Sequence, residues 1–281
     1  MNISVNAEMA EQILRGFHIP AKPEVLNNLH KLISTGEASP DNVADTVSSD
    51  VGLSAAILKT INSPFYKMAR QIADIQQAVV LLGVDTVTTL IAAYEIKRLM
   101  SQKACISLER FWDEATDVAK TMAYIGREIN QSVPAEDLYA VGLFHDCGIP
   151  ALAMKFMNYK ELLIESNENH DVSIIQLEEQ HYNTNHAVVG YYISSSWDLP
   201  KEICDVILRH HEEKTLDRLE TDYFITSYSI LKLAENIVER TRRFRSKAEW
   251  NGIKDGVLET LGLTDADYSD LEEDSGDIVL T

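Results

Sequence analysis

The sequence predicts an all-α protein, and three observations support this prediction. Apolar residues recur at helical spacing along most of the 281-residue chain. Stretches in which apolar and polar residues alternate, as they do in half-buried strands, are missing from the sequence. The chain also has only 12 Gly and 7 Pro, which is too few for a collagen-like, linker-rich or disordered protein.

The first expected helices lie between residues 23 and 91. Pro23 suits a first helical turn, and the apolar residues from Val25 to Ile33 fall on one stripe. Gly83 interrupts a later apolar segment, which predicts two helices joined by a tight junction. Asn62-Ser63-Pro64 predicts a helix end, with contact to a partner protein as the alternative role.

Further helices are expected in the second part of the chain. A long one runs from about Leu108 to Gln131. Pro134, which is followed by two acidic residues, begins another, because carboxylates favour the positive end of a helix dipole. Leu199-Pro200-Lys201-Glu202 begins one more. Helices are therefore predicted along the whole length of the chain.

Charge and cysteine content exclude several classes of protein. The net charge is −19 and the pI about 4.7, so we expect no binding to nucleic acid and none to an anionic membrane, since both rest on Lys and Arg. Three separated cysteines predict neither a thiol zinc site nor a disulfide framework. The N-terminus lacks the apolar core of a signal peptide, and no apolar run is long enough to span a membrane. These features predict a cytoplasmic protein.

The acidic charge is unevenly distributed, and this suggests a division of the chain. Residues 1–105 have a net charge of −1, residues 106–264 of −11 and residues 265–281 of −7. The periodicity breaks near residues 101–107. We therefore expect an N-terminal helical bundle (1–105) packed on a larger helical half (106–264). An acidic tail (265–281) follows, and its self-repulsion predicts mobility.

The residues with the clearest chemical potential are histidines and acids of the larger half. His145 and Asp146 are adjacent, follow an apolar helix and precede Gly148, which is expected to stop that helix. An imidazole and a carboxylate presented together suit a divalent metal. His186 begins an amphipathic run, and the pair His210-His211 ends another helix.

Several segments, in order along the chain, resemble the HD superfamily of metal-dependent phosphohydrolases, and most closely its HDOD (HD-related output domain) branch. The resemblance extends over roughly residues 19–211. The segments that carry it are Ile19-Pro20-Ala-Lys-Pro23-Glu24-Val25, Asp50-Val-Gly-Leu-Ser through Asn62-Ser63, Ile75-Gln-Gln-Ala78 through Leu82-Gly83, Phe111-Trp112, Gly142-Leu-Phe-His145-Asp146-Cys-Gly148, and His186 through His211.

This resemblance implies an all-helical fold with an HD-like second half and a role in bacterial signalling. It also implies a metal site. HD enzymes hold metal with an upstream His, the His-Asp pair and a distal Asp. Here the upstream position reads Glu114 and the distal one Glu235, so the implied metal ligands are His145, Asp146, Glu114 and Glu235. By the same resemblance, His186 and His210 or His211 match extra ligand positions of the HD-GYP phosphodiesterase branch, although the Gly-Tyr-Pro motif of that branch is missing from this sequence. Such a shell would suit Mg²⁺, Mn²⁺ or Fe²⁺.

Each of these residues also has a plain structural interpretation. Asp146 would then orient His145 or cap the next helix without metal. His186 would donate to a nearby carbonyl, and one residue of the pair His210-His211 would face solvent. Glu114 and Glu235 would be ordinary solvated acids. Both interpretations remain open at this point.

The sequence has one concentration of basic residues within its acidic half. It forms either a solvated face that answers nearby acids or a site for a phosphate-bearing ligand, because guanidinium groups bind phosphate oxygens in pairs. Its members are Arg240, Arg242, Arg243, Arg245 and Lys247.

The leading hypothesis is a signalling HDOD protein with a degenerate HD pocket, acting as a binding or interaction module. Its partner would be a signalling protein or a phosphate-bearing small ligand, and no receiver or cyclase module is expected on this chain. The alternative is a metal-dependent phosphohydrolase for nucleotides or cyclic nucleotides, in which Asp146, His186 and His210 take catalytic roles. A third hypothesis is a homo-oligomeric scaffold assembled through the N-terminal bundle.

Overall fold

The computed structural model describes Phe17 and residues 21–62, 71–100, 103–168, 172–212, 215–217 and 220–279. Within these ranges the ordered elements are all helices, and no strand occurs, which confirms the all-α prediction. In chain order they are α2 (Glu24–Thr35), α3 (Pro40–Ser48), α4 (Val51–Ile61), α5 (Ile75–Leu82), α6 (Val84–Leu99), α7 (Leu108–Glu128), α8 (Ala135–Phe144), α9 (Gly148–Lys155), α10 (Tyr159–Glu168), α11 (Ile174–Tyr182), α12 (His186–Ser196), α13 (Lys201–Arg209), the 3₁₀ helix η2 (Thr215–Asp217), α14 (Asp222–Arg243), α15 (Trp250–Leu261) and α16 (Asp265–Val279).

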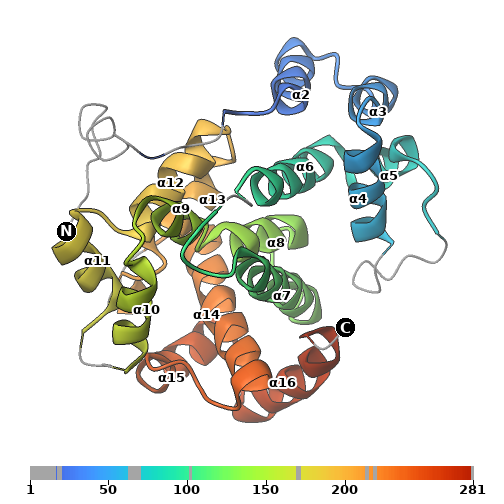
Figure 1. Cartoon of the computed structure of the whole chain (residues 1–281). Coiled ribbons are helices and arrows are strands. Elements are labelled where there is room, and N and C mark those ends of the chain that lie inside the picture. Colours follow the sequence, from blue (N-terminus) through green and yellow to red (C-terminus); the bar gives the residue numbers. More distant parts are fainter. Residues whose placement is uncertain are drawn as a thin grey trace.

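Helices α2 to α5 form a small bundle at one side of the molecule, and α6 joins it to the rest (Figure 1). Side chains of Ser39, Asp50 and Asp74 cap the first turns of α3, α4 and α5 by accepting backbone N–H groups. Gly83 separates α5 from α6 with φ 85°, a conformation that glycine adopts without strain. The predicted junction between two helices is confirmed.

The helix end predicted at Asn62-Ser63-Pro64 is found, because α4 stops at Ile61. The Asn62 side chain donates to the carbonyl of Ile72 (2.8 Å) and accepts from its N–H (2.7 Å). These two hydrogen bonds connect the end of α4 to the segment that precedes α5. They support a structural role for Asn62. Ser63 and Pro64 lie outside the described residues.

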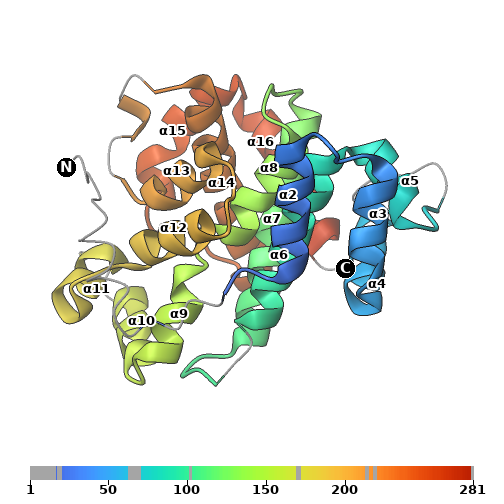
Figure 2. The same cartoon turned by 90° about the horizontal axis from the view of Figure 1, so that it is seen from above.

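The larger half is built around α7, which packs on α8, α14 and α16. Figure 2 shows α6 beside α7 and α8, and contacts between α6 and α8 join the two halves. The interior contains all three tryptophans: Trp112 and Trp197 are each 1% exposed and Trp250 is 3% exposed. The division near residue 105 falls in the connection from α6 to α7 and remains a prediction.

The acidic segment after residue 264 differs from the expected mobile tail. Its residues 265–279 form α16, which lies against α7 and α14 (Figure 1). Tyr268, Leu271 and Val279 are buried, and the Tyr268 hydroxyl accepts a hydrogen bond from Asn236 (3.0 Å). Burial of an apolar stripe outweighs the self-repulsion, so the prediction of mobility is corrected for this range.

No single helix in the described part of the chain is long and apolar enough to cross a membrane. By length and composition α5 and α6 pass that test only as a pair, across a bend of 120°.

Candidate metal centre

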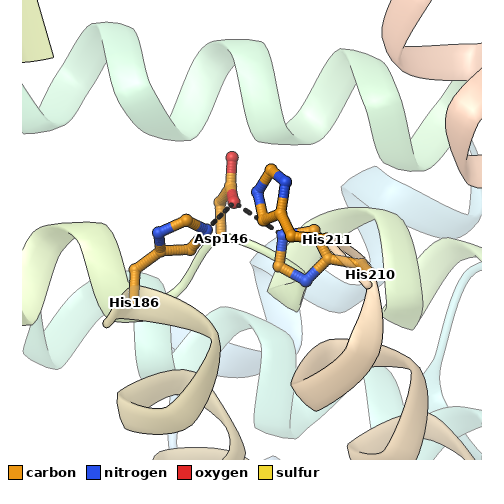
Figure 3. A group of neighbouring side chains, drawn as sticks. All are labelled: Asp146, His186, His210 and His211. Carbon is orange, nitrogen blue, oxygen red and sulfur yellow. Dashed lines mark hydrogen bonds and ion pairs between the residues drawn. The ribbon is translucent and has the colours of Figure 1, made fainter. Parts of the chain in front are cut away.

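Four helix ends bring the histidines and Asp146 together. His145 is the C-cap of α8, and Asp146 follows in the turn before α9. His186 begins α12, and His210 is the C-cap of α13, with His211 next to it. Figure 3 shows the imidazoles of His186 and His210 directed at the Asp146 carboxylate.

The turn that carries Asp146 is arranged differently from the prediction. Gly148 is expected to stop a helix, but α8 has already ended at Phe144 and Gly148 begins α9. A side chain at this position would collide with the backbone carbonyl of His186. The glycine therefore serves a close approach between α9 and α12, which places Asp146 beside His186.

The Asp146 carboxylate is the centre of the cluster. Its Oδ2 lies 3.2 Å from Nε2 of His145. Its Oδ1 lies 3.2 Å from Nε2 of His186 and 3.3 Å from Nε2 of His210. His145, His186 and His210 are buried, and the Asp146 side chain is 23% exposed. One carboxylate thus meets three imidazoles at the edge of the protein interior.

The opposite ring nitrogens of these histidines all face acceptors. His145 Nδ1 lies 2.8 Å from the Gly142 carbonyl and His210 Nδ1 2.7 Å from the Ile207 carbonyl. A carbonyl oxygen can only accept, so Nδ1 must carry the proton in both rings. The Nε2 atoms that face Asp146 therefore present lone pairs in the neutral rings. This is the tautomer in which a histidine binds a metal through Nε2.

Glu178 on α11 orients the third histidine, and sequence reasoning missed it. The carboxylate is fully buried and accepts from the His186 backbone N–H (2.9 Å) and from Nδ1 of its ring (2.8 Å). It also accepts from the hydroxyl of Tyr159. A single acid eight positions before a histidine has no distinguishing signal in a sequence, so this residue could be found only in the structure.

The buried charges shift the pKa values of the cluster. Burial would raise the pKa of Asp146, but the imidazoles, His145 first, hold it well below its usual range. Burial opposes charge on His186, yet Glu178 and Asp146 raise its pKa to about 10. The pKa of His145 is also raised, against its burial, mainly by Asp146. Burial lowers the pKa of His210 and, further, that of His211.

The cluster has the donor set and the spacing of a metal site. Asp146, His186, His210 and His211 each offer one ligand atom, and these atoms lie within 4.8 Å of one another. His186 Nε2 is buried, and its 3.2 Å contact with Asp146 Oδ1 does not meet hydrogen-bond geometry. Three imidazoles with one carboxylate suit divalent transition metals. The residues present could hold such an ion.

This cluster differs from the ligand set implied by the sequence. Of the four implied ligands only Asp146 belongs to the cluster, whereas His186, His210 and His211 stand where the resemblance implied extra ligand positions. His145 contacts Asp146, and its Nε2 lies 3.8 Å from Oε1 of Glu235. Glu235 itself is engaged by Lys232, whose Nζ lies 3.0 Å from Oε2. Glu114 lies on the wall of the same cavity and pairs with Arg243 at 2.6 Å. The structure therefore brings Glu114 and Glu235 near the cluster but pairs each with a base.

A cavity of about 490 Å³ opens beside the cluster. Among the described residues that line it, carboxylates and Lys or Arg side chains are equal in number, so their formal charges cancel when the lining histidines are neutral, as they are when they bind a metal. The acids are Glu114, Asp146, Glu235 and Glu239, and the bases are Arg110, Arg243, Arg245 and Lys247.

The basic concentration of the sequence is paired with acids, and part of it lines the cavity, while its role as a phosphate site stays a prediction. Each of its five members pairs with an acid, as a face that answers nearby carboxylates would. Three of them, Arg243, Arg245 and Lys247, also line the cavity. The pairs are Arg240 with Glu272, Arg242 with Asp117, Arg243 with Glu114 and Glu239, Arg245 with Glu239, and Lys247 with Glu235.

Comparison with known proteins is consistent with this architecture. The HDOD domain matches residues 19–213. An HDOD domain protein of unknown function from Geobacter sulfurreducens superposes with a TM-score of 0.70 at 22% identity, over 96% of this chain and 93% of that one. A protein from Shewanella amazonensis SB2B named "Putative phosphohydrolase" gives 0.70 at 18% identity, over 98% and 95% of the two chains. At these identities the superpositions show the fold alone.

One curated relative matches much of the chain. An uncharacterized protein of Treponema pallidum (strain Nichols) is 22% identical over 193 residues, which are 69% of this chain. The chain spans only 37% of that relative's length. The HDOD match covers well over half of the present chain. The chain therefore belongs to the HDOD domain family.

Proposed function

We propose that this HDOD protein is a regulatory binding module whose pocket holds a divalent metal ion and a phosphate-bearing small ligand. The observation that carries the proposal is the cluster of Asp146 with His186, His210 and His211 beside a cavity lined by four Arg or Lys side chains. Imidazole and carboxylate bind the metal, and guanidinium groups recognise phosphate. A signalling protein partner would read the ligand-bound state.

Charge supports a dianionic ligand. The formal charges of the cavity lining cancel, so a divalent ion would leave an excess of two positive charges. A phosphate ester that carries two negative charges would balance this excess. Arg110 lies at the N-terminal end of α7, and Arg245 and Lys247 follow α14, so the ligand would contact two separate elements.

The pairing of the two substituted acids favours binding over hydrolysis. Glu114 and Glu235 stand at positions where the phosphohydrolase resemblance implies metal ligands, and they pair with Arg243 and Lys232. A carboxylate engaged by a base at hydrogen-bond distance is a weaker candidate for binding a cation. The pocket would then retain a metal through its histidines without completing the hydrolytic shell.

A metal-dependent phosphohydrolase is the second candidate, and the His145-Asp146 pair favours it. A bound divalent ion would supply an activated water and stabilise charge on a phosphoryl group. Asp146, His186 and His210 would hold that ion, while Arg243 and Arg245 would orient the phosphate. The metal would be Mn²⁺ or Fe²⁺ rather than Mg²⁺, because imidazole nitrogens predominate.

Metal content and ligand binding test the proposal together. We expect the purified full chain, supplied with Mn²⁺ or Fe²⁺, to retain metal after desalting, as measured by elemental analysis. We expect His186→Gln to lose it and His181→Gln, which changes an exposed histidine of α11, to keep it. Calorimetry with nucleoside monophosphates and cyclic nucleotides should show binding to the metal-loaded protein, with no product by chromatography.

Two results would reject the binding module. A wild-type chain that holds no metal under these conditions would remove its basis. Turnover of any of these phosphoesters that is lost in His186→Gln and kept in His181→Gln would establish the phosphohydrolase instead.

A further inference from the structure

Lys232 is a charged side chain in the interior of the larger half. It lies on α14, is 2% exposed and stands one helical turn before Glu235. Its ammonium lies 3.0 Å from Oε2 of Glu235 and 2.8 Å from Oε1 of Glu249. A lysine is rarely buried to this extent without a paired charge, and here it has two.

The second oxygen of Glu235 also faces positive charge. Its Oε1 lies 3.6 Å from Nζ of Lys247 and 3.8 Å from Nε2 of His145. Both carboxylate oxygens thus have a lysine as neighbour. A metal ion bound to Glu235 would have to approach these ammonium groups in a buried environment, where repulsion between cations is weakly screened.

The charges beside Glu235 also oppose a second cation. Glu235 and Glu249 contribute two negative charges, which Lys232 and Lys247 already balance. A second divalent ion at Glu235 would therefore leave an uncompensated excess of positive charge beside buried groups.

We propose that Lys232 takes the place of a second metal ion, so that the centre binds a single divalent cation through Asp146 and its histidines. Glu235 is then a partner of lysine and not a ligand, and Lys232 positions it. The same arrangement recurs at Glu114, which Arg243 engages. This inference rests on the metal binding proposed above and specifies its stoichiometry.

Metal stoichiometry measured on the full chain tests the inference. The protein is saturated with Mn²⁺, desalted and assayed for metal per chain, and its electron paramagnetic resonance spectrum is recorded. We expect one ion per chain with the hyperfine pattern of isolated Mn²⁺. Two ions, or the spectrum of a coupled pair, would overturn the inference and leave metal binding intact. No ion would overturn both.

Variants of the lysine and its partner test the assigned roles. Glu235→Gln keeps the shape of the side chain, and we expect it to bind one ion with affinity within about tenfold of the wild type, since loss of a true ligand or its support typically costs more. Loss of the ion in this variant would show that Glu235 is a ligand and would contradict the assignment.

Lys232→Met removes the built-in cation, and we expect the uncompensated Glu235 and Glu249 to admit a second ion. Lys201→Met, at an exposed lysine of α13, is the matched control and should stay at one. A folded Lys232→Met protein that still binds only one ion would refute the proposal that Lys232 takes the place of a second metal ion. Should circular dichroism show this variant unfolded, the wild-type and Glu235→Gln stoichiometries decide the question.

Discussion

Glu178 is the residue that determines how His186 faces the metal centre. Its carboxylate binds both the backbone N–H and the Nδ1 atom of His186, and Tyr159 holds the carboxylate from the other side. A carboxylate in this position fixes the tautomer and increases the basicity of the opposite nitrogen. It would therefore influence a metal bound by His186 without contacting it.

We expect Glu178→Gln to weaken metal binding by about 10- to 100-fold, the usual effect of losing such a partner. The amide keeps the size of the side chain but removes the charge that stabilises the protonated Nδ1. Titration with Mn²⁺ followed by calorimetry measures the change. Glu165→Gln, at an exposed acid of α10, is the control and should leave the affinity unaltered. Equal affinities for both variants would disprove the role of Glu178.

The sequence predicts some of these site residues but not the way they are combined. His145-Asp146, His186 and His210 are recognisable because they lie at predicted helix ends. Glu178 and Lys232 are not, because a buried acid or lysine looks like any surface residue until its neighbours are known. The partners of Lys232 illustrate the reason: Glu249 lies 17 positions away along the chain, and only the tertiary fold brings the two side chains together.

At the scale of elements, the approach of α9 to α12 positions the centre. Gly148 is the first residue of α9, and because it has no side chain the start of this helix can lie against α12. A Cβ atom added at Gly148 would lie 2.0 Å from the His186 carbonyl oxygen and 2.9 Å from the Gly190 nitrogen. His186 is part of this contact, and Asp146 lies two residues before Gly148. Their mutual distance therefore depends on backbone packing between the two helices.

Gly148→Ala should destabilise the protein by about 3 kcal/mol, because the added methyl group meets backbone that cannot rotate away. Gly252→Ala is the matched control. It lies in α15 with open space around it, and the higher helix propensity of alanine should stabilise by about 0.5–1 kcal/mol. Urea unfolding measures both free energies. A Gly148→Ala protein as stable as the wild type would show that the two helices can separate freely.

Element prediction succeeds where local chemistry decides and fails where packing decides. Gly83 separates two helices as predicted, since a positive φ there is a local requirement. The long helix α7 begins at the predicted Leu108 and ends at Glu128, a few residues early. Gly148 is misread as a stop because its function is a contact with α12. Helix α16 is missed because seven acids suggested a mobile tail, whereas burial on α7 and α14 stabilises it.

At the scale of the whole molecule, the net charge of −19 is unevenly distributed among the regions of the chain. The cavity lining is neutral in formal charge, although it belongs to the half that carries most of the acid. Four of the basic residues of that half line the cavity, and α14 carries a further three. Seven of the acidic residues lie after residue 264, where several find bases, such as Asp265 with Lys254 at 2.5 Å.

Removing residues 265–281 therefore sets two effects against each other. The truncation deletes seven negative charges, but most lie on the surface, where salt screens them beyond about 8 Å at physiological ionic strength. It also removes the buried side chains of Tyr268, Leu271 and Val279. Each buried apolar side chain contributes about 1.5–3 kcal/mol, so packing dominates. We expect truncation to lower the free energy of unfolding by on the order of 5 kcal/mol in urea.

A variant that changes charge without packing separates the two effects. Asp270→Asn with Glu273→Gln removes two charges from exposed positions of α16 and keeps the buried stripe. Because reduced repulsion is its only consequence, its unfolding free energy should equal or slightly exceed that of the wild type. The opposite outcome would be that truncation raises the unfolding free energy and that the variant raises it by a smaller amount, in proportion to the two charges it removes. Repulsion would then dominate, and α16 would contribute no packing energy. The burial of Tyr268 against Asn236 argues for the first outcome.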